Sequence, residues 1–189
     1  MNQSFLSTAL RYHAWATEQT LLATDALDDA DWTRDLGDSF GGVADTLKHL
    51  VQTEVAISSA LFKHDLEQLA VNKELSRDLL VAMFELLNEE YRALADRLSR
   101  PDHAGFVDRP FTLYGATVTN TEPFFDLFLH AAYHRGQIAT MLRQLGVQAT
   151  GTQFAAFLLN ATSPIKHWQA NEPHYGQELP AQGHATSLE

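Results

Sequence analysis

Apolar residues recur at helical spacing in four long segments of the chain. The first segment covers residues 4–26, and the second carries its apolar positions from Val43 to Leu61. The third covers residues 79–98 and the fourth residues 124–145, and these two have the strongest period. Apolar residues three and four positions apart share one face of a helix. Four amphipathic helices of similar length predict an all-α fold, a four-helix bundle around a shared core.

Capping residues indicate where these helices begin and end. Ser39 is expected to cap the second helix, and Ser76 or Asp78 to start the third, because their side chains can accept a hydrogen bond from a free backbone N–H. Residues 121–123, Thr-Glu-Pro, are expected to open the fourth helix, since proline is tolerated in a first turn. Gly146 is a natural C-terminal stop.

Two parts of the chain depart from the plain bundle pattern. Residues 106–119 break the helical period and predict a short β-hairpin or irregular excursion before the last core helix, with its turn near Gly115. A shorter helix is expected over residues 152–160. We therefore expect one domain over residues 1–162 and a polar C-terminal tail over residues 163–189.

Length, composition and charge are those of a soluble globular protein. The 189 residues suffice for one domain with a proper core. No apolar run approaches the roughly 20 residues needed to cross a bilayer, and no signal peptide is apparent at the N-terminus. We therefore expect a cytoplasmic protein without membrane association. The formal net charge of -11 predicts no nucleic-acid partner, because phosphates are neutralised by a basic patch.

Histidine is the only strong candidate ligand for a transition metal, since the chain has nine histidines and no cysteine. His130 and His134 stand one helical turn apart in FLHAAYHRGQI, so both rings can contact one ion. Leu127 and Ile138 share their face, which therefore points into the bundle. A buried imidazole needs partners for its nitrogens. A metal would satisfy both rings, and hydrogen bonds between core histidines and neighbouring polar groups are the alternative.

A third ligand from another helix would favour the metal. His49 in DTLKHLVQTE is the first candidate, although it lies on the flank of its apolar stripe beside Ala56 and Ala60. His13 is the second candidate, because it shares the apolar stripe of the first helix. Three protein ligands and an open position are typical of catalytic sites, and a fourth protein ligand indicates a structural site. The other histidines are expected away from this site: His64, His103, His167, His174 and His184.

The ordered combination of these motifs resembles the DinB-like superfamily. The resemblance rests on the histidine in DTLKHLVQTE followed by HAAYHRGQI, on the early aromatic segment RYHAWA, on SFGG before the second helix and on the closing LRQLG. It covers roughly residues 4–146. Many members carry an asparagine immediately before the second histidine, where this chain has Leu129.

The resemblance implies a fold, a metal site and an activity. It implies an up-up-down-down bundle that frequently forms homodimers, and a divalent metal, zinc or nickel, on His49, His130 and His134. Better-understood members are thiol transferases or isomerases that use low-molecular-weight thiols. We therefore expect a metal-dependent thiol transferase that acts on a small-molecule substrate. A metal-dependent hydrolase, and a non-catalytic dimeric stress or ligand-binding bundle with a structural metal, are the alternatives.

Three polar side chains near the histidines are further candidates for the site. Arg135 could bind a carboxylate of a thiol cofactor through its fork of donors, or form a structural ion pair or a helix-end contact. Gln137 could orient a ligand or bound water, or make an interhelical hydrogen bond. Glu54 could be an acceptor behind the ligands or a general base, or be solvated or salt-bridged. Tyr12 and Trp15 are expected to be packing residues.

Overall fold

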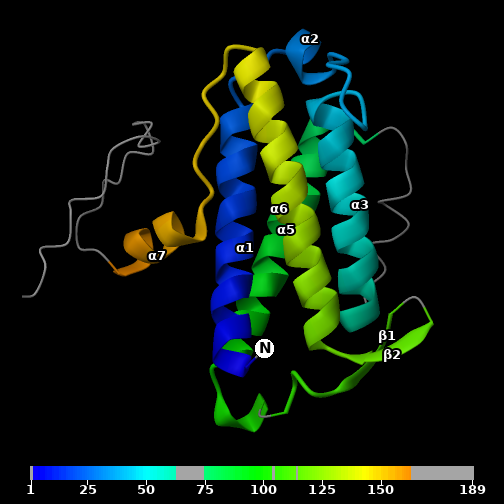
Figure 1. Ribbon diagram of the computed structural model, residues 1–189, viewed down its shortest axis with the longest axis vertical. Coiled ribbons are helices and arrows are strands. Elements are labelled where there is room, and N and C mark those ends of the chain that lie inside the picture. Colours follow the sequence, from blue (N-terminus) through cyan, green and yellow to red (C-terminus); the bar gives the residue numbers. More distant parts are fainter. Residues whose placement is uncertain (1, 63–74, 104, 114, 163–189) are drawn as a thin grey trace, which may run out of the picture.

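The computed structural model describes residues 2–62, 75–103, 105–113 and 115–162. Four long helices form a bundle in it, as the periodicity predicts (Figure 1). Their bounds are α1 (Gln3–Thr24), α3 (Val43–Phe62), α5 (Arg77–Leu98) and α6 (Thr121–Gln144). In the part of the chain that the structure describes, no helix is both long enough and apolar enough to span a membrane.

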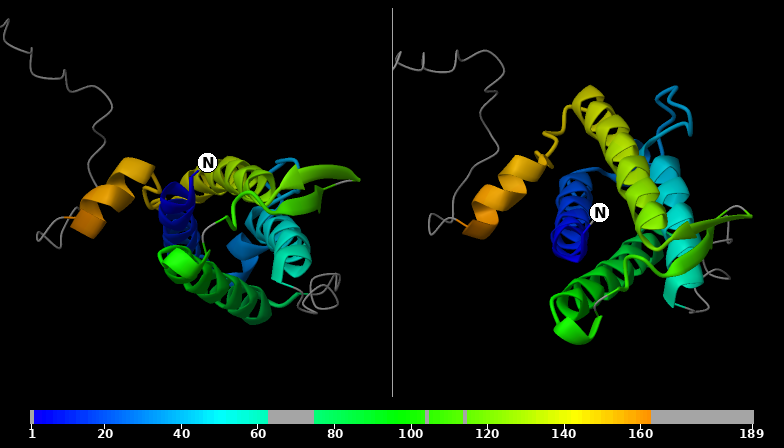
Figure 2. Two further views of the ribbon diagram at one scale, coloured as in Figure 1. Left: turned by 90° about the horizontal axis from the view of Figure 1, so that it is seen from below. Right: turned by 60° about the horizontal axis from the view of Figure 1, so that its bottom comes forward.

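The helices run up, down, down and up in chain order, so the expected up-up-down-down arrangement is wrong (Figures 1 and 2). Hydrogen bonds fix α1 antiparallel to α5: the Gln3 amide donates to the Leu98 carbonyl at one end, and Arg77 donates to the Thr24 carbonyl at the other. The physical reason is that after α1, and again after α5, the chain turns back at the same end of the bundle. Helices joined by such returns are antiparallel, and only the connection from α3 to α5 joins two helices of one direction.

The observed helix ends confirm some capping predictions and correct another. Ser76 caps α5, and its side chain accepts a 3.2 Å hydrogen bond from the backbone N–H of Leu79. Gly146 follows α6 with a φ of 77°, as a helix stop requires. Ser39 does not cap the second long helix, because α3 begins only at Val43, after a tight turn that carries Ser39.

The connections at the two ends of the bundle contain small elements of their own. A short helix, α2 (Asp29–Trp32), lies between α1 and α3. The 3-10 helix η1 (Pro101–His103) follows α5. The antiparallel strands β1 (Pro110–Leu113) and β2 (Ala116–Thr119) then confirm the predicted hairpin.

The last helix, α7 (Phe154–Thr162), packs on the outer face of α1 through aromatic rings. The Tyr12 ring meets the Phe154 ring edge-on at 5.1 Å between centroids, and the Trp15 ring lies 5.7 Å from that of Phe157. Tyr12 and Trp15 are therefore packing residues, as expected. Residues 163–189, the expected tail, lie outside the described residues.

Candidate metal centre

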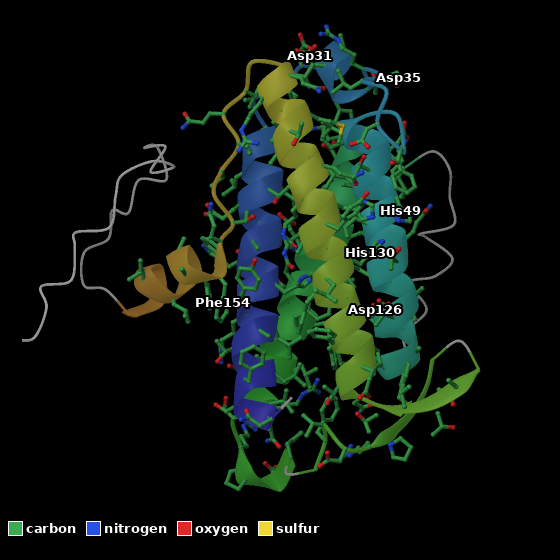
Figure 3. The ribbon with its side chains drawn as sticks, viewed as in Figure 1. Asp31, Asp35, His49, Asp126, His130 and Phe154 are labelled. Carbon is green, nitrogen blue, oxygen red and sulfur yellow. The ribbon has the colours of Figure 1, made fainter. Side chains whose placement is uncertain are left out.

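Three histidines from two helices converge on one point between α3 and α6. His49 lies on α3 and His130 lies on α6 (Figure 3). His134 lies one turn further along α6. The Nε2 atom of His130 is 3.0 Å from that of His49 and 3.1 Å from that of His134. Their candidate ligand atoms all lie within 4.8 Å of one another. The structure thus brings together the three histidines that the sequence singled out and could hold a metal ion on them.

The short contacts suit a shared ion better than hydrogen bonds between the rings. The Nε2 atom of a neutral imidazole carries either one hydrogen or one lone pair. His130 therefore cannot make two well-directed hydrogen bonds with the Nε2 atoms that it contacts at 3.0 and 3.1 Å. Nitrogens bound to one zinc-like ion at about 2.0–2.1 Å lie roughly 2.9–3.4 Å apart for bond angles between square and tetrahedral. The two separations from His130 Nε2 fit that range.

A hydrogen-bond chain fixes the orientation of the His134 ring. The Gln137 amide nitrogen donates to Asp38 Oδ1 at 3.0 Å, so the amide oxygen faces His134 Nδ1 at 2.6 Å. Because a carbonyl oxygen only accepts, His134 must carry its hydrogen on Nδ1. The Nε2 lone pair then points into the cluster, as a metal ligand requires. Gln137 thus orients the His134 ring and joins α6 to the turn before α3, and neither of these two hydrogen bonds is the interhelical one that the sequence left open. Asp38 was not among the predicted site residues.

The turn before α3 supplies a second support for the cluster. The Phe40 ring stacks on the His49 ring, with 4.0 Å between centroids and 16° between planes. A hydrogen bond from Gly41 N to Asp38 O closes the turn at 2.9 Å. Next to it, a Cβ on Gly42 would come within 2.1 Å of a backbone oxygen. The SFGG stretch therefore has a local role that the sequence did not reveal: it places Asp38 and Phe40 beside the histidines.

The environment of the cluster lowers the pKa of two of its rings and so disfavours their protonation. Burial lowers the pKa of His49, and the neighbouring His134 lowers it further. Burial also lowers the pKa of His130, as do His134 and His49, while the carboxylates of Asp126 and Glu54 oppose the shift. Metal binding requires neutral imidazole. The same effects that disfavour protonation therefore prepare both rings to bind a cation.

Glu54 lies in the bundle core and not in solvent, which excludes the solvated alternative. Its side chain has no exposed surface, and neither has that of His13. The Glu54 Oε1 atom lies 3.3 Å from His13 Nε2, and Oε2 accepts a 3.4 Å hydrogen bond from the Tyr91 hydroxyl. His13, the second candidate for the third ligand, thus faces Glu54 and is not part of the cluster of His49, His130 and His134.

Arg135 faces α1 and not the histidine cluster. Only 3% of its surface is exposed, and its guanidinium carbon lies 5.8 Å from the centre of the Tyr12 ring. It lines a cavity of about 10 Å³ between α1, α6 and residues 149–152, enough for about one water molecule. Among the described residues, its guanidinium nitrogens have no hydrogen-bond partner, and the expected ion pair is not seen. Because this small cavity lies on the α1 side, Arg135 is not placed to bind a ligand at the cluster.

Two side chains on the outer face of α6 lie close to the ligands. Leu129, which replaces the asparagine of many DinB-like proteins, is 56% exposed and points away from the core. Tyr133 is 64% exposed, and its ring meets the His134 ring edge-on at 5.1 Å. The substitution at Leu129 therefore changes the surface next to the cluster and leaves the three rings in place.

Fold and cluster together define a class of protein: a four-helix bundle with a three-histidine cluster, on an antiparallel pair of its helices, that could hold a metal ion. The family model for the DinB family matches residues 1–170. This chain belongs to the DinB family. A comparison with curated proteins finds no match.

Proposed function

We propose that this protein binds one divalent transition metal, Zn²⁺ or Ni²⁺, on His49, His130 and His134, and activates the thiol of a small cofactor there. The convergence of three Nε2 atoms supports the proposal most directly. Imidazole suits both zinc and nickel. Three protein ligands leave a coordination position for a small molecule, which is typical of catalytic sites.

The proposed chemistry is transfer of a low-molecular-weight thiol to an electrophilic carbon. When bound, a divalent metal would lower the pKa of a coordinated thiol or water so that its deprotonated form is present near neutral pH. Because the chain has no cysteine, the thiol must come from a small molecule. Its sulfur forms a new S–C bond, the leaving group departs with the electrons of the broken bond, and the thiol proton passes to solvent.

The protein's own side chains would position the reactants. Gln137 holds the Nδ1 hydrogen of His134 and thereby keeps Nε2 directed into the cluster. Phe40 and Tyr133, with 37% and 64% of their surfaces exposed, present aromatic rings beside the histidines. Aromatic side chains commonly line small-molecule sites, so an apolar part of the substrate would lie against these two rings.

Metal analysis of the untagged protein by mass spectrometry tests the first half of the proposal. We expect close to one Zn²⁺ or Ni²⁺ per chain, and its loss in His49→Ala, His130→Ala and His134→Ala. His13→Gln is the matched control, because His13 is a buried histidine outside the cluster. Full metal content in His49→Ala together with loss in His13→Gln would show that the ligand set is wrong.

Cobalt-substituted protein tests the second half. Titration with glutathione, bacillithiol or mycothiol should produce a thiolate-to-cobalt charge-transfer band if the thiol binds the metal. The zinc- or nickel-loaded protein should then conjugate the same thiol to chlorodinitrobenzene, with release of chloride. Metal-loaded protein that gives neither the band nor the conjugate with any of these thiols would refute thiol transfer and leave metal binding intact.

A further inference from the structure

A buried cation lies on the side of α6 that faces α1. Arg135 has only 3% of its surface exposed, and it lines the cavity of about 10 Å³ between α1, α6 and residues 149–152. Within the described residues, all three of its guanidinium nitrogens are without a hydrogen-bond partner. A guanidinium keeps its charge in proteins, and a buried charge is costly unless it is paired. The charge of Arg135 therefore needs a partner in or beside this cavity.

The described walls of the cavity carry donors and no carboxylate. Besides Arg135, they consist of three threonines, three alanines and one leucine. The hydroxyl of Thr20 already donates to the Ala16 carbonyl at 2.9 Å, so it can only accept a further hydrogen bond. Thr150 and Thr152 add two hydroxyls, each of which can rotate its hydrogen toward a ligand. A cavity with one cation, hydroxyl donors and no negative charge favours an anion.

Contacts on two sides hold the guanidinium beside the cavity. Its carbon atom lies 5.8 Å from the centre of the Tyr12 ring. The Tyr12 hydroxyl donates to the backbone oxygen of Thr152 at 2.8 Å. Tyr12 on α1 thus contacts both Arg135 on α6 and the segment that leads from α6 to α7. Because its phenol hydrogen is used in that bond, Tyr12 is neutral and does not balance the charge of Arg135.

Glu54 is the competing source of negative charge. Burial lowers the pKa of Arg135, and both Tyr12 and Glu54 oppose that shift. The oxygens of Glu54 contact other groups, however: one lies 3.3 Å from His13 Nε2, and the other accepts a 3.4 Å hydrogen bond from the Tyr91 hydroxyl. In the ranges that the structure describes, no carboxylate accepts a hydrogen bond from Arg135. The N–H donors of its guanidinium therefore remain unfilled whatever Glu54 contributes.

We propose that this cavity binds one chloride ion, held by the guanidinium of Arg135 and the hydroxyls of Thr150 and Thr152. Space for about one water molecule admits a small monovalent anion and excludes phosphate, sulfate and carboxylates. A water molecule would occupy some of the donors but would leave the buried charge unbalanced. The ion joins α6 to the segment before α7 and thereby stabilises the packing of that segment on the bundle. The site is separate from the proposed metal and thiol chemistry.

Thermal unfolding and chlorine NMR of the metal-free, full-length protein test the proposal, with chloride compared against gluconate at equal ionic strength. In about 0.2 M chloride we expect a Tm about 2–4 °C higher than in gluconate, and a chlorine resonance that the protein broadens. Arg135→Met keeps the length of the side chain, removes its charge and should abolish both effects. Arg143→Met is the matched control, because Arg143 is an exposed arginine of the same helix. Thr150→Val should weaken chloride binding about tenfold.

The outcomes separate this site from the metal centre. Chloride binding that appears only after the protein is loaded with zinc would place the ion on the metal and overturn the Arg135 site. Equal Tm values in chloride and gluconate, with a chlorine resonance no broader than in Arg135→Met, would show that water alone fills the cavity. If Arg135→Met does not fold, crystals of the wild type soaked in bromide decide. We expect an anomalous bromide peak within hydrogen-bond distance of the Arg135 guanidinium, and a map without that peak would overturn the proposal.

Discussion

Gly42 is a position where one added methyl group would disturb both the fold and the candidate metal centre. A Cβ at this residue would lie 2.1 Å from the carbonyl oxygen of Arg34, whereas ordinary contacts begin at 3.4 Å. The chain would have to move by more than 1 Å to accommodate it. Because the obstacle is backbone and not the end of a flexible side chain, a change of rotamer cannot relieve the clash.

We expect Gly42→Ala to lower the free energy of unfolding by about 2 kcal/mol, within the roughly 1–3 kcal/mol that overpacking costs. For a domain of this size, that corresponds to a decrease in Tm of roughly 4–8 °C. The displacement would also reach the cluster. Gly41, the preceding residue, accepts a 2.7 Å hydrogen bond from Leu36 N and donates a 2.9 Å bond to Asp38 O. Metal affinity should therefore fall together with stability.

Urea unfolding of the metal-free protein and titration with Co²⁺ measure the two effects. Gly37→Ala is the matched control, because Gly37 has a φ of +73° and nothing lies within 4 Å of an added Cβ. That variant suffers backbone strain of roughly 1–2 kcal/mol, partly offset by about 0.4–1 kcal/mol from a less flexible unfolded chain. It should keep its metal affinity. A Gly42→Ala protein as stable as wild type, or with unchanged Co²⁺ affinity, would refute the reasoning.

Three further predictions follow from the core and the cluster. Gln137→Leu should weaken Co²⁺ binding about 10–100-fold, measured by competition with a chelator, because His134 loses the acceptor that fixes its Nδ1 hydrogen; unchanged affinity would contradict this role. Phe84→Ala should lower the free energy of unfolding by about 3–5 kcal/mol, since Phe84 is fully buried, and a loss below about 1 kcal/mol in urea would be inconsistent with the packing. The pKa values of His49 and His130 are lowered from 6.5 in the folded state. The unfolded chain therefore binds protons first, so the stability of the metal-free protein should be full above about pH 6.5 and fall as the pH is lowered below it, with a shallower fall in His49→Ala.

The periodicity of the sequence predicted the helices well, whereas the order of their directions, which only the resemblance implied, was wrong. The apolar stripe over residues 79–98 corresponds to α5, and the stripe over residues 124–145 corresponds to α6. A helical stripe depends on neighbours three and four residues apart, so it can be read locally. Helix direction depends on where each connection crosses the bundle. Nothing in the composition of those connections indicates which of them crosses from one end of the bundle to the other. The up-up-down-down order was therefore not testable from the sequence, and it was wrong.

The histidines could be predicted, and most of their supports could not. The four-residue spacing of His130 and His134 is local, and the resemblance to the DinB-like superfamily pointed to His49. The contact of Asp38 with Gln137 joins residues 99 positions apart. This contact exists only because the turn before α3 lies beside the C-terminal half of α6. The position of Glu54 on the apolar side of its helix was a usable signal, although its partners on α1 and α5 could not be named from it.

A divalent ion on three neutral imidazoles keeps its full charge, so the protein must place negative charge nearby or leave that charge to solvent. Asp38 is the carboxylate that the structure joins to the cluster, through the hydrogen bonds from Gln137 to Asp38 and between Gln137 and His134. This chain acts on the orientation of one ring, because Asp38 contacts the Gln137 amide and Gln137 holds the Nδ1 hydrogen of His134. On this reasoning, loss of Asp38 should mainly disorder the His134 ring.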